Sequence, residues 1–202
     1  MRVVVAFPWR ETPERVAGYQ MVRDWYQVNL VNAAMVEVDT DSEVFSLAAC
    51  RNRAVAVAKD LGADVVVISD ADTIPPPTAL HDAIEGAAVD GQLHMPYDQC
   101  IYAGTDSPPG LANGGVHVVT PACWDALGGQ DERLVGWGGD DDQLIAAATC
   151  LVGVVRHPGC AVSLWHADAN RWCNDENRKI AHRYWEAVGN PDAMRQLIER
   201  HR

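Results

Sequence analysis

The sequence is poor in positive charge, in paired cysteines and in long hydrophobic runs, and each scarcity excludes a class of protein. Its 202 residues include 16 Lys and Arg against 28 Asp and Glu, a formal net charge of −12. This balance disfavours broad, sequence-independent binding to nucleic acid or to an anionic membrane. The six cysteines have no Cys-x-x-Cys spacing, and several lie in apolar stretches. We therefore expect reduced thiols and neither a zinc site nor disulfides.

No apolar run in the sequence is long enough to cross a membrane. The run at residues 2–7 stops at Pro8 without a signal-peptide core or a small-residue cleavage site. We therefore expect a cytoplasmic protein without membrane insertion. The composition, 48% hydrophobic and 22% charged, is that of an ordinary globular protein, and no repeat or long linker divides the chain.

Strand-like and helix-like segments alternate along the first half of the chain. Strands are expected at residues 3–7, 35–38 and 63–69, and helices at residues 13–28, 47–61 and 77–88, the first with Thr12 as N-cap and Pro13 at its first position. This alternation predicts an α/β fold with an open sheet that is mostly parallel at its start.

The second half is less regular. We expect a strand at 115–119, helices at 121–127 and 140–151, a late strand pair at 153–156 and 161–165, and C-terminal helices at 177–188 and 191–202.

The most informative motif is Asp70-Ala71-Asp72, which ends the apolar run of residues 65–68 and precedes three prolines. The β-branched run predicts a buried strand, and alternation along an extended chain places Asp70 and Asp72 on the same side. Two carboxylates that leave a strand together form a cation site. A solvated corner between strand and loop is the alternative.

A second acidic cluster, Gly136 to Asp142, contains a tryptophan between glycines followed by three aspartates. A helix N-terminus accounts for one or two of these aspartates, because the helix dipole favours negative charge there. It does not account for Trp137, which offers a flat apolar surface on which a sugar can stack. A carboxylate beside a bound sugar hydroxyl can act as a general base.

His166 closes the late strand pair. A histidine at such a position is more often a hydrogen-bonded structural residue than a ligand. Beside an Asp-x-Asp site it becomes a candidate ligand, and mixed oxygen and imidazole ligation suits Mn²⁺, with Mg²⁺ as the alternative.

These motifs together resemble GT-A-type glycosyltransferases, in particular the β-1,4-galactosyltransferase group and related bacterial members. The similarity extends over roughly residues 3 to 170. The motifs that carry it, in order, are Pro8-Trp9-Arg10, Asn52-Arg53-Ala54, residues 68–75, Gly114-Gly115-Val116, residues 136–142 and His166.

The resemblance implies a role for each matching residue. Pro8, Arg10, Arg53 and Asp70 match nucleotide-binding positions, and Asp72 and His166, with Asp70 beside them, match the metal site. Asp141 matches the general base. Trp137, Gly115, Gly138, Asp140 and Asp142 match positions that bind the acceptor or shape the sugar site.

The resemblance also implies a fold and an activity. We expect a single-domain GT-A (Rossmann-like) nucleotide-sugar-binding fold with a mixed central sheet, with residues 1–170 as catalytic domain and 171–202 as a helical extension packed on it. The activity is metal-dependent inverting glycosyl transfer from a nucleotide sugar, expected to be a UDP-sugar, to a hydroxyl acceptor that the sequence does not identify. Retaining relatives tend to lack a carboxylate at the position of Asp141, which favours inversion.

Two departures and two other functions remain open. Ala112-Asn113 replaces aromatic residues that help to choose the donor sugar in the family, and Ser163 replaces a methionine that assists metal binding in some members. Residues 167–177 match a lid but also fit a plain connector. A non-catalytic nucleotide- or carbohydrate-binding module is the alternative function. A nucleotidyltransferase is disfavoured, because no Gly-rich, Lys-bearing loop follows the first strand.

Overall fold

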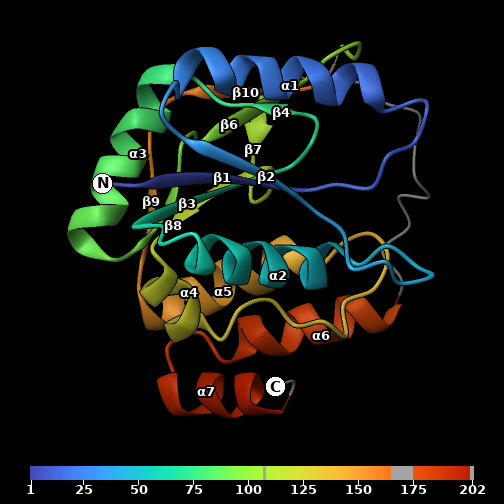
Figure 1. The fold of residues 1–202 in the computed structure, drawn as a ribbon. Coiled ribbons are helices and arrows are strands. Elements are labelled where there is room, and N and C mark those ends of the chain that lie inside the picture. The colour runs from blue at the N-terminus through green and yellow to red at the C-terminus, as the bar shows by residue number, and fades with distance from the viewer. Residues whose placement is uncertain (107, 165–174, 201–202) are drawn as a thin grey trace.

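The computed structural model describes residues 1–106, 108–164 and 175–200. A six-stranded mixed sheet, in the order β2-β1-β3-β8-β5-β9, and a four-stranded sheet, in the order β4-β10-β6-β7, form its framework. In Figure 1, α1 lies above the large sheet, α2, α4 and α5 lie below it, and α6 and α7 lie further below.

The strands are β1 Val3–Pro8, β2 Ala34–Val38, β3 Val65–Ser69, β4 Thr73–Ile74, β5 Leu93–Met95, β6 Gln99–Tyr102, β7 Gly110–Leu111, β8 Val116–Val119, β9 Val154–Arg156 and β10 Cys160–Ser163. The helices are α1 Val16–Asn29, α2 Leu47–Asp60, α3 Pro77–Asp90, α4 Pro121–Leu127, α5 Asp140–Leu151, α6 Asp175–Glu186 and α7 Pro191–Glu199.

The parallel start of the sheet is confirmed. β1 pairs in parallel with both β2 and β3, and the next strand, β8, runs antiparallel to β3. The carboxyl end of β3 therefore lies beside the amino end of β8. This places the Asp70 segment next to the Gly114-Gly115 segment at one edge of the sheet.

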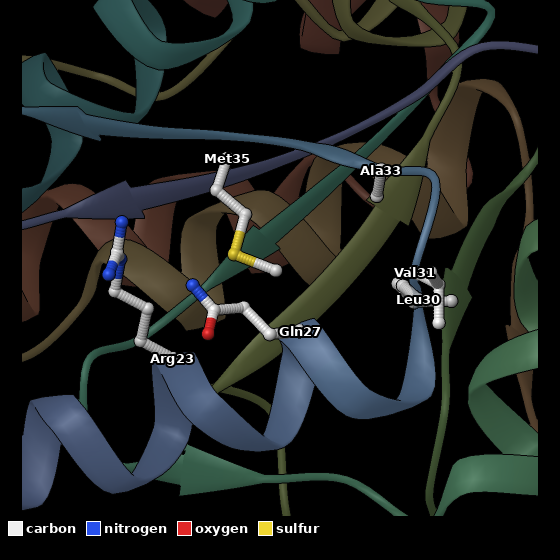
Figure 2. Close-up of a pocket in the computed structure, with 6 residues that line it drawn as sticks. All are labelled: Arg23, Gln27, Leu30, Val31, Ala33 and Met35. Atoms are coloured by element: carbon white, nitrogen blue, oxygen red, sulfur yellow. The ribbon is translucent and has the colours of Figure 1, made fainter.

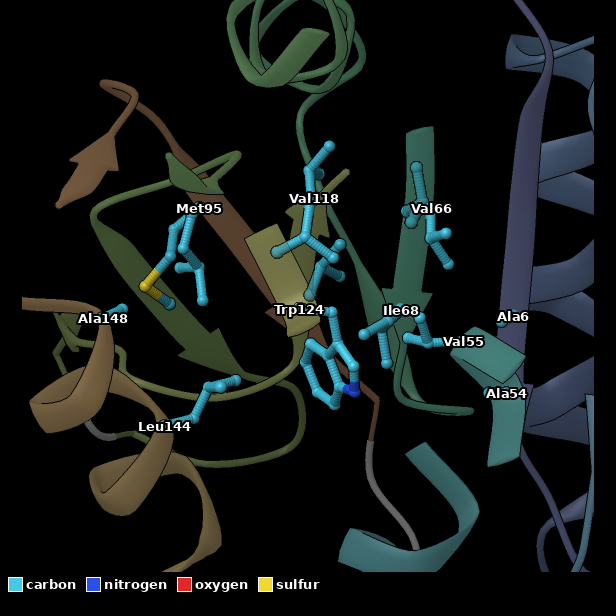
Figure 3. Close-up of a cluster of buried hydrophobic side chains, with 14 of the residues drawn as sticks. Ala6, Ala54, Val55, Val66, Ile68, Met95, Val118, Trp124, Leu144 and Ala148 are labelled. Carbon is cyan, nitrogen blue, oxygen red and sulfur yellow. The ribbon is translucent and has the colours of Figure 1, made fainter. Parts of the chain in front are cut away.

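The hydrophobic core includes residues of α1 and α3, and a large part of it lies between this sheet and the helices below it. Figure 3 shows Val66 and Ile68 of β3 and Val118 of β8 beside Trp124 of α4 and Val55 of α2. All of these side chains are at most 5% exposed. Because this packing fixes α2, α4 and α5 against the same sheet face, the residues at the ends of these helices have defined positions relative to β3.

The C-terminal helices pack on α5. Ile180 and Tyr184 of α6 belong to the same hydrophobic core as the sheet residues, and the Tyr184 hydroxyl donates to the carboxylate of Asp131 at 3.2 Å. Among the described residues no helix is long and apolar enough to cross a membrane. The cysteines of the described ranges, Cys50, Cys100, Cys123, Cys150 and Cys160, are free thiols.

The expected start of the first helix is wrong. Residues 13–15 form a turn, and α1 begins at Val16. The Thr12 carbonyl accepts from the backbone N–H groups of Arg15 at 3.0 Å and Val16 at 3.3 Å. Thr12 therefore closes a turn through its main chain, whereas an N-cap would accept through its side chain.

The two late strands are present close to the expected residues, but the expectation that they pair with each other is wrong. β9 pairs in parallel with β5 in the large sheet, while β10 pairs in parallel with β6 and antiparallel with β4 in the small sheet. The segment from β9 to β10 thus runs alongside the segment from β5 to β6, in the same direction, and both segments pass from the large sheet to the small one. Sequence periodicity did not reveal β4, β5, β6 and β7, which are two to four residues long and show little alternation.

Candidate functional site

The two carboxylates of the Asp70-Ala71-Asp72 motif lie where β3 ends. The backbone N–H of Asp70 donates to the Gly115 carbonyl at 2.7 Å, which joins this end of β3 to the segment before β8. The Asp72 carboxylate accepts from the Thr73 hydroxyl at 3.1 Å and lies 3.4 Å from the Arg15 guanidinium. The structure therefore fixes both carboxylates at the carboxyl edge of the sheet.

Arg51 of α2 connects this edge to the second acidic cluster. Its side chain is 0% exposed, and its Nη2 donates to Asp70 at 2.8 Å while its Nη1 donates to Asp141 at 2.7 Å and to Asp140 at 3.1 Å. The two motifs that the sequence analysis singled out are thus brought together on one buried guanidinium. Arg51 itself was not predicted.

A signal for Arg51 was present in the sequence. On the helical period of α2, position 51 falls in the stripe of small apolar residues that contains Ala54, Val55 and Ala58, all of them buried. A charged residue in an apolar stripe needs buried partners of opposite charge. The partners lie 19 to 90 residues away in the sequence, so the pattern indicates a buried ion pair but does not identify its carboxylates.

The pKa values of the three carboxylates around Arg51 are shifted in different directions. Burial, together with the charge of Asp141, raises the pKa of Asp70 to about 6 and that of Asp140 to about 7. Burial opposes the ionisation of Asp141 as well, but Arg51 and His117 outweigh it and keep the pKa of Asp141 below its usual value. Asp141 therefore has the lowest pKa of the three, and its side chain is 29% exposed, against 23% for Asp70 and 10% for Asp140.

The Gly114-Gly115 segment packs against this cluster without side chains. A Cβ on Gly114 would lie 2.0 Å from Asp141 Oδ2, and a Cβ on Gly115, whose φ is +100°, would lie 2.4 Å from the Tyr97 hydroxyl. Tyr97 is buried, and its hydroxyl donates to the Gly114 carbonyl and accepts from the Val116 N–H, both at 2.7 Å. Glycine is required here because other atoms occupy the space that a side chain would fill.

Trp137 lies in the loop that leads into α5, between Gly136 and Gly138, and is 51% exposed. The side-chain amide of Asn177 on α6 donates to the carbonyls of Val135 at 3.1 Å and Gly138 at 2.9 Å. The loop is therefore anchored on both sides of an indole that remains accessible to solvent. Such a surface can stack against a ring.

Asp142, predicted to bind acceptor or shape the sugar site, contacts another part of the protein. Its carboxylate accepts from the Asn113 side-chain amide at 2.9 Å, and the Asn113 carbonyl oxygen Oδ1 accepts from Arg156 of β9 at 2.7 Å. This chain of polar contacts connects the start of α5 with the segment before Gly114. Asp142 therefore holds the segment before Gly114 against the start of α5.

The residues predicted to bind a nucleotide lie on or beside different elements, and no contact joins them in the structure described. Pro8 is buried at the end of β1, paired with Val38. The Arg10 guanidinium binds the Asp39 carboxylate through two contacts, at 2.6 and 2.8 Å, and lies over the Phe45 ring at 5.5 Å. Arg53 is exposed on α2, two residues beyond Arg51. Sequence reasoning missed Asp39, which directly follows β2 at the same sheet edge.

His166, the predicted third metal residue, lies outside the described residues. The backbone leading to it is placed, since the Leu164 N–H donates to the Asp72 carbonyl at 2.7 Å. Within the described ranges, no three His, Cys, Asp or Glu side chains form a ready metal site. The local charge nevertheless fits a cation, because three carboxylates share one guanidinium and Asp72 lies beside them. Carboxylate oxygens are ligands that Mn²⁺ and Mg²⁺ accept.

A surface pocket elsewhere has no part in this arrangement. Figure 2 shows it between α1 and the start of β2, lined by Arg23, Gln27, Leu30, Val31, Ala33 and Met35. It lies at the amino end of β2, whereas Asp39 and Asp70 follow the carboxyl ends of parallel strands. In open α/β sheets the carboxyl ends are the usual place for ligands.

The fold has counterparts among solved structures. No family model matches the chain, and no curated protein matches it in sequence. The solved structures that match include GT-A glycosyltransferases, and the predicted GT-A fold with a mixed central sheet is confirmed.

Three of these structures illustrate the match. The Drosophila β1,4-galactosyltransferase 7 mutant D211N, in complex with manganese, UDP-Gal and xylobiose, matches with a TM-score of 0.56 at 17% identity, over 77% of this chain and 64% of that one. The mannosyltransferase PcManGT of Pyrobaculum calidifontis, in complex with GDP-Man and Mn²⁺, matches with a TM-score of 0.55 at 16% identity, over 98% of this chain and 68% of that one. GalNAc-T7 in complex with UDP, GalNAc and Mn²⁺ matches with a TM-score of 0.56 at 9% identity, over 97% of this chain and 54% of that one. The chain thus spans less than two thirds of the galactosyltransferase and GalNAc-T7 structures.

Proposed function

We propose that the protein is a metal-dependent inverting glycosyltransferase that moves a sugar from a nucleotide sugar, with UDP-sugars first among the candidates, to a hydroxyl acceptor. One observation carries the proposal. On a GT-A fold, the Asp-x-Asp carboxylates and Asp141 lie at the same sheet edge, and Arg51 joins Asp70 to Asp141. Solved structures with this fold contain Mn²⁺ together with UDP-Gal, GDP-Man or UDP.

The donor would occupy the carboxyl ends of β1, β2 and β3. Pro8, Arg10 and Arg53 are assigned to the nucleotide, and Asp70 and Asp72, with His166, to the metal. When bound, a divalent cation there would neutralise the negative charge that develops on the diphosphate leaving group. The positive charge of Arg51 would offset part of the negative charge of the neighbouring carboxylates. This favours the binding of an anionic donor.

The acceptor would stack on Trp137 with its hydroxyl directed at Asp141. Asp141 would take the hydroxyl proton as the acceptor oxygen forms its bond to the anomeric carbon. The bond from that carbon to the phosphate oxygen breaks at the same time, and the nucleoside diphosphate leaves with the electron pair. Because attack and departure occur on opposite faces, the configuration at the anomeric carbon inverts. A positioned general base contributes about 10²- to 10⁴-fold to such a step.

The first test is a donor screen with the purified protein and Mn²⁺, measuring release of the nucleoside diphosphate from UDP-sugars and GDP-sugars. We expect release from one donor class, and its loss in Asp72→Ala. Asp192→Ala is the matched control, since that carboxylate is 90% exposed on α7. Unchanged turnover in Asp72→Ala would refute the metal assignment.

The base assignment is tested separately. Asp141→Asn keeps the size of the side chain and removes its basicity, so we expect nucleotide binding within about threefold of wild type and turnover lower by about 10²-fold or more. Asp140→Asn is the comparison, because it alters a neighbouring carboxylate of the same Arg51 cluster. Full activity of Asp141→Asn would exclude it as base. Tight nucleotide binding by wild type with no release across donors and acceptors would instead favour a non-catalytic module.

A further inference from the structure

Arg51 has an environment that a simple structural ion pair does not require. It is fully buried, and its two terminal nitrogens point to different elements, Nη2 to Asp70 after β3 and Nη1 to Asp140 and Asp141 at the start of α5. Its Nε has no hydrogen-bond partner among the described residues. The guanidinium is thus oriented entirely by carboxylates on its two sides.

The carboxylates belong to opposite halves of the proposed site. Asp70 lies on the donor side, next to Asp72, and Asp141 lies on the acceptor side, against Gly114. A planar guanidinium fixes the directions of its N–H groups, so carboxylates bound at its two ends have a defined spacing. The main chain adds a second link between the halves, because the Asp70 N–H binds the Gly115 carbonyl.

We propose that Arg51 is a positioning residue that sets Asp141 relative to the donor side and transmits donor binding to the acceptor side. This inference rests on the proposed function. A divalent cation that binds Asp70 competes with Arg51 for the same carboxylate. The guanidinium then interacts more strongly with Asp140 and Asp141, and the first turn of α5 becomes more firmly held once the donor is bound.

The alternative is that Arg51 only neutralises buried charge. Arg51→Lys separates the two ideas, because lysine keeps the positive charge but cannot bind carboxylates on two sides with a rigid fork. Arg51→Met removes the charge as well, and we expect it to lower the denaturation midpoint strongly or to prevent folding. Arg23→Lys, at a partly exposed position on α1 near Glu37, controls for the loss of a guanidinium as such.

The first measurement is hydrogen exchange without ligand. We expect the amides of residues 139–143 in Arg51→Lys to exchange about tenfold faster than in wild type or Arg23→Lys, while those of β1 and β3 stay unchanged. Equal exchange at the start of α5 in all three proteins would overturn the positioning role.

The second measurement repeats the exchange with Mn²⁺ and UDP, or GDP if the screen selects it, at concentrations that calorimetry shows to be saturating. In wild type we expect slower exchange at residues 139–143. In Arg51→Lys we expect binding within about threefold of wild type without that slowing, and kcat reduced at least about tenfold with little change in donor KM. Slowing that persists in Arg51→Lys, or a lysine variant with wild-type kcat, would refute the coupling. If wild type binds neither nucleotide, the proposed function fails, while the exchange without ligand still decides the positioning role.

Discussion

His117 makes the stability of the protein depend on pH in a way that can be calculated. The side chain is fully buried in β8, its Nε2–H donates to the Asn113 carbonyl at 2.9 Å, and its Nδ1 has no partner among the described residues. Burial, with the nearby charges of Arg51 and Arg156, lowers the pKa of His117 from 6.5 to about 4, although Asp141 acts in the opposite direction. The imidazole is therefore neutral in the native protein at pH 7.

The sign and size of the effect follow from proton linkage. Between pH 6.5 and 4 the unfolded chain binds a proton at this residue and the native state does not. The contribution of His117 to the free energy of unfolding is therefore complete above pH 6.5 and is lost as the pH falls toward 4. A lowering of the pKa from 6.5 to about 4 corresponds to about 3 kcal/mol in total, of which about 2 kcal/mol is lost between pH 8 and pH 5.

The measurement is urea unfolding of wild type and His117→Gln at pH 8 and at pH 5. Glutamine offers an amide N–H for the same carbonyl and does not titrate. The raised pKa values of Asp70 and Asp140 affect both proteins with the opposite sign, so only the difference between the proteins isolates His117. We expect wild type to lose about 2 kcal/mol relative to the variant on acidification. A difference that stays the same at both pH values would refute the reasoning.

Three substitutions test packing around the site and the core. In Gly114→Ala the new Cβ meets Asp141 Oδ2 at 2.0 Å, so turnover in the nucleotide-release assay should fall sharply; wild-type turnover would show that Asp141 need not lie where it does. Tyr97→Phe removes a hydroxyl with two backbone contacts and should lower the free energy of urea unfolding by about 1–3 kcal/mol, a change below about 0.5 kcal/mol being inconsistent with those contacts. Gly86→Ala places a Cβ 2.3 Å from buried His94 and should destabilise by about 1–3 kcal/mol in the same assay; an increase in stability would mean that helix propensity outweighs the clash.

Gly110→Ala is the control for the two glycine substitutions. A Cβ there meets nothing within 4 Å, so both turnover and the free energy of unfolding should stay close to the wild-type values.

The sequence predicted the elements whose signals are local. The β-branched run of β3, the Thr120-Pro121 start of α4 and the acidic first turn of α5 each depend on neighbouring residues, and α4 and α5 have the predicted bounds. The small sheet was not predicted, because β10 pairs with strands 60 or more residues away, as in the pairing of Ser163 with Tyr102, and β4 and β7 have only two residues each. Tertiary context decides such short strands.

The residues of the candidate site also fall into those with a local sequence signal and those without one. Asp70, Asp72 and Asp141 were candidates because each lies in a short local motif, at residues 70–72 and 136–142. Arg51 and Tyr97 were not, because their roles depend on contacts between distant segments, and a helix period shows only that a side chain is buried. Arg10 was named as a candidate nucleotide-binding residue, but its partner Asp39 was not, because their contact depends on the pairing of β1 with β2.

The Arg51 cluster also restricts how this sheet edge can diverge or be redesigned. Loss of Arg51 would leave buried carboxylates without their cation, and loss of the carboxylates would leave a buried cation, each at a cost of about 3–5 kcal/mol for the isolated change. A concerted exchange for well-packed apolar residues carries no such penalty. Arg51, Asp70, Asp140 and Asp141 are therefore best treated as one unit of substitution, although they come from three separate parts of the chain.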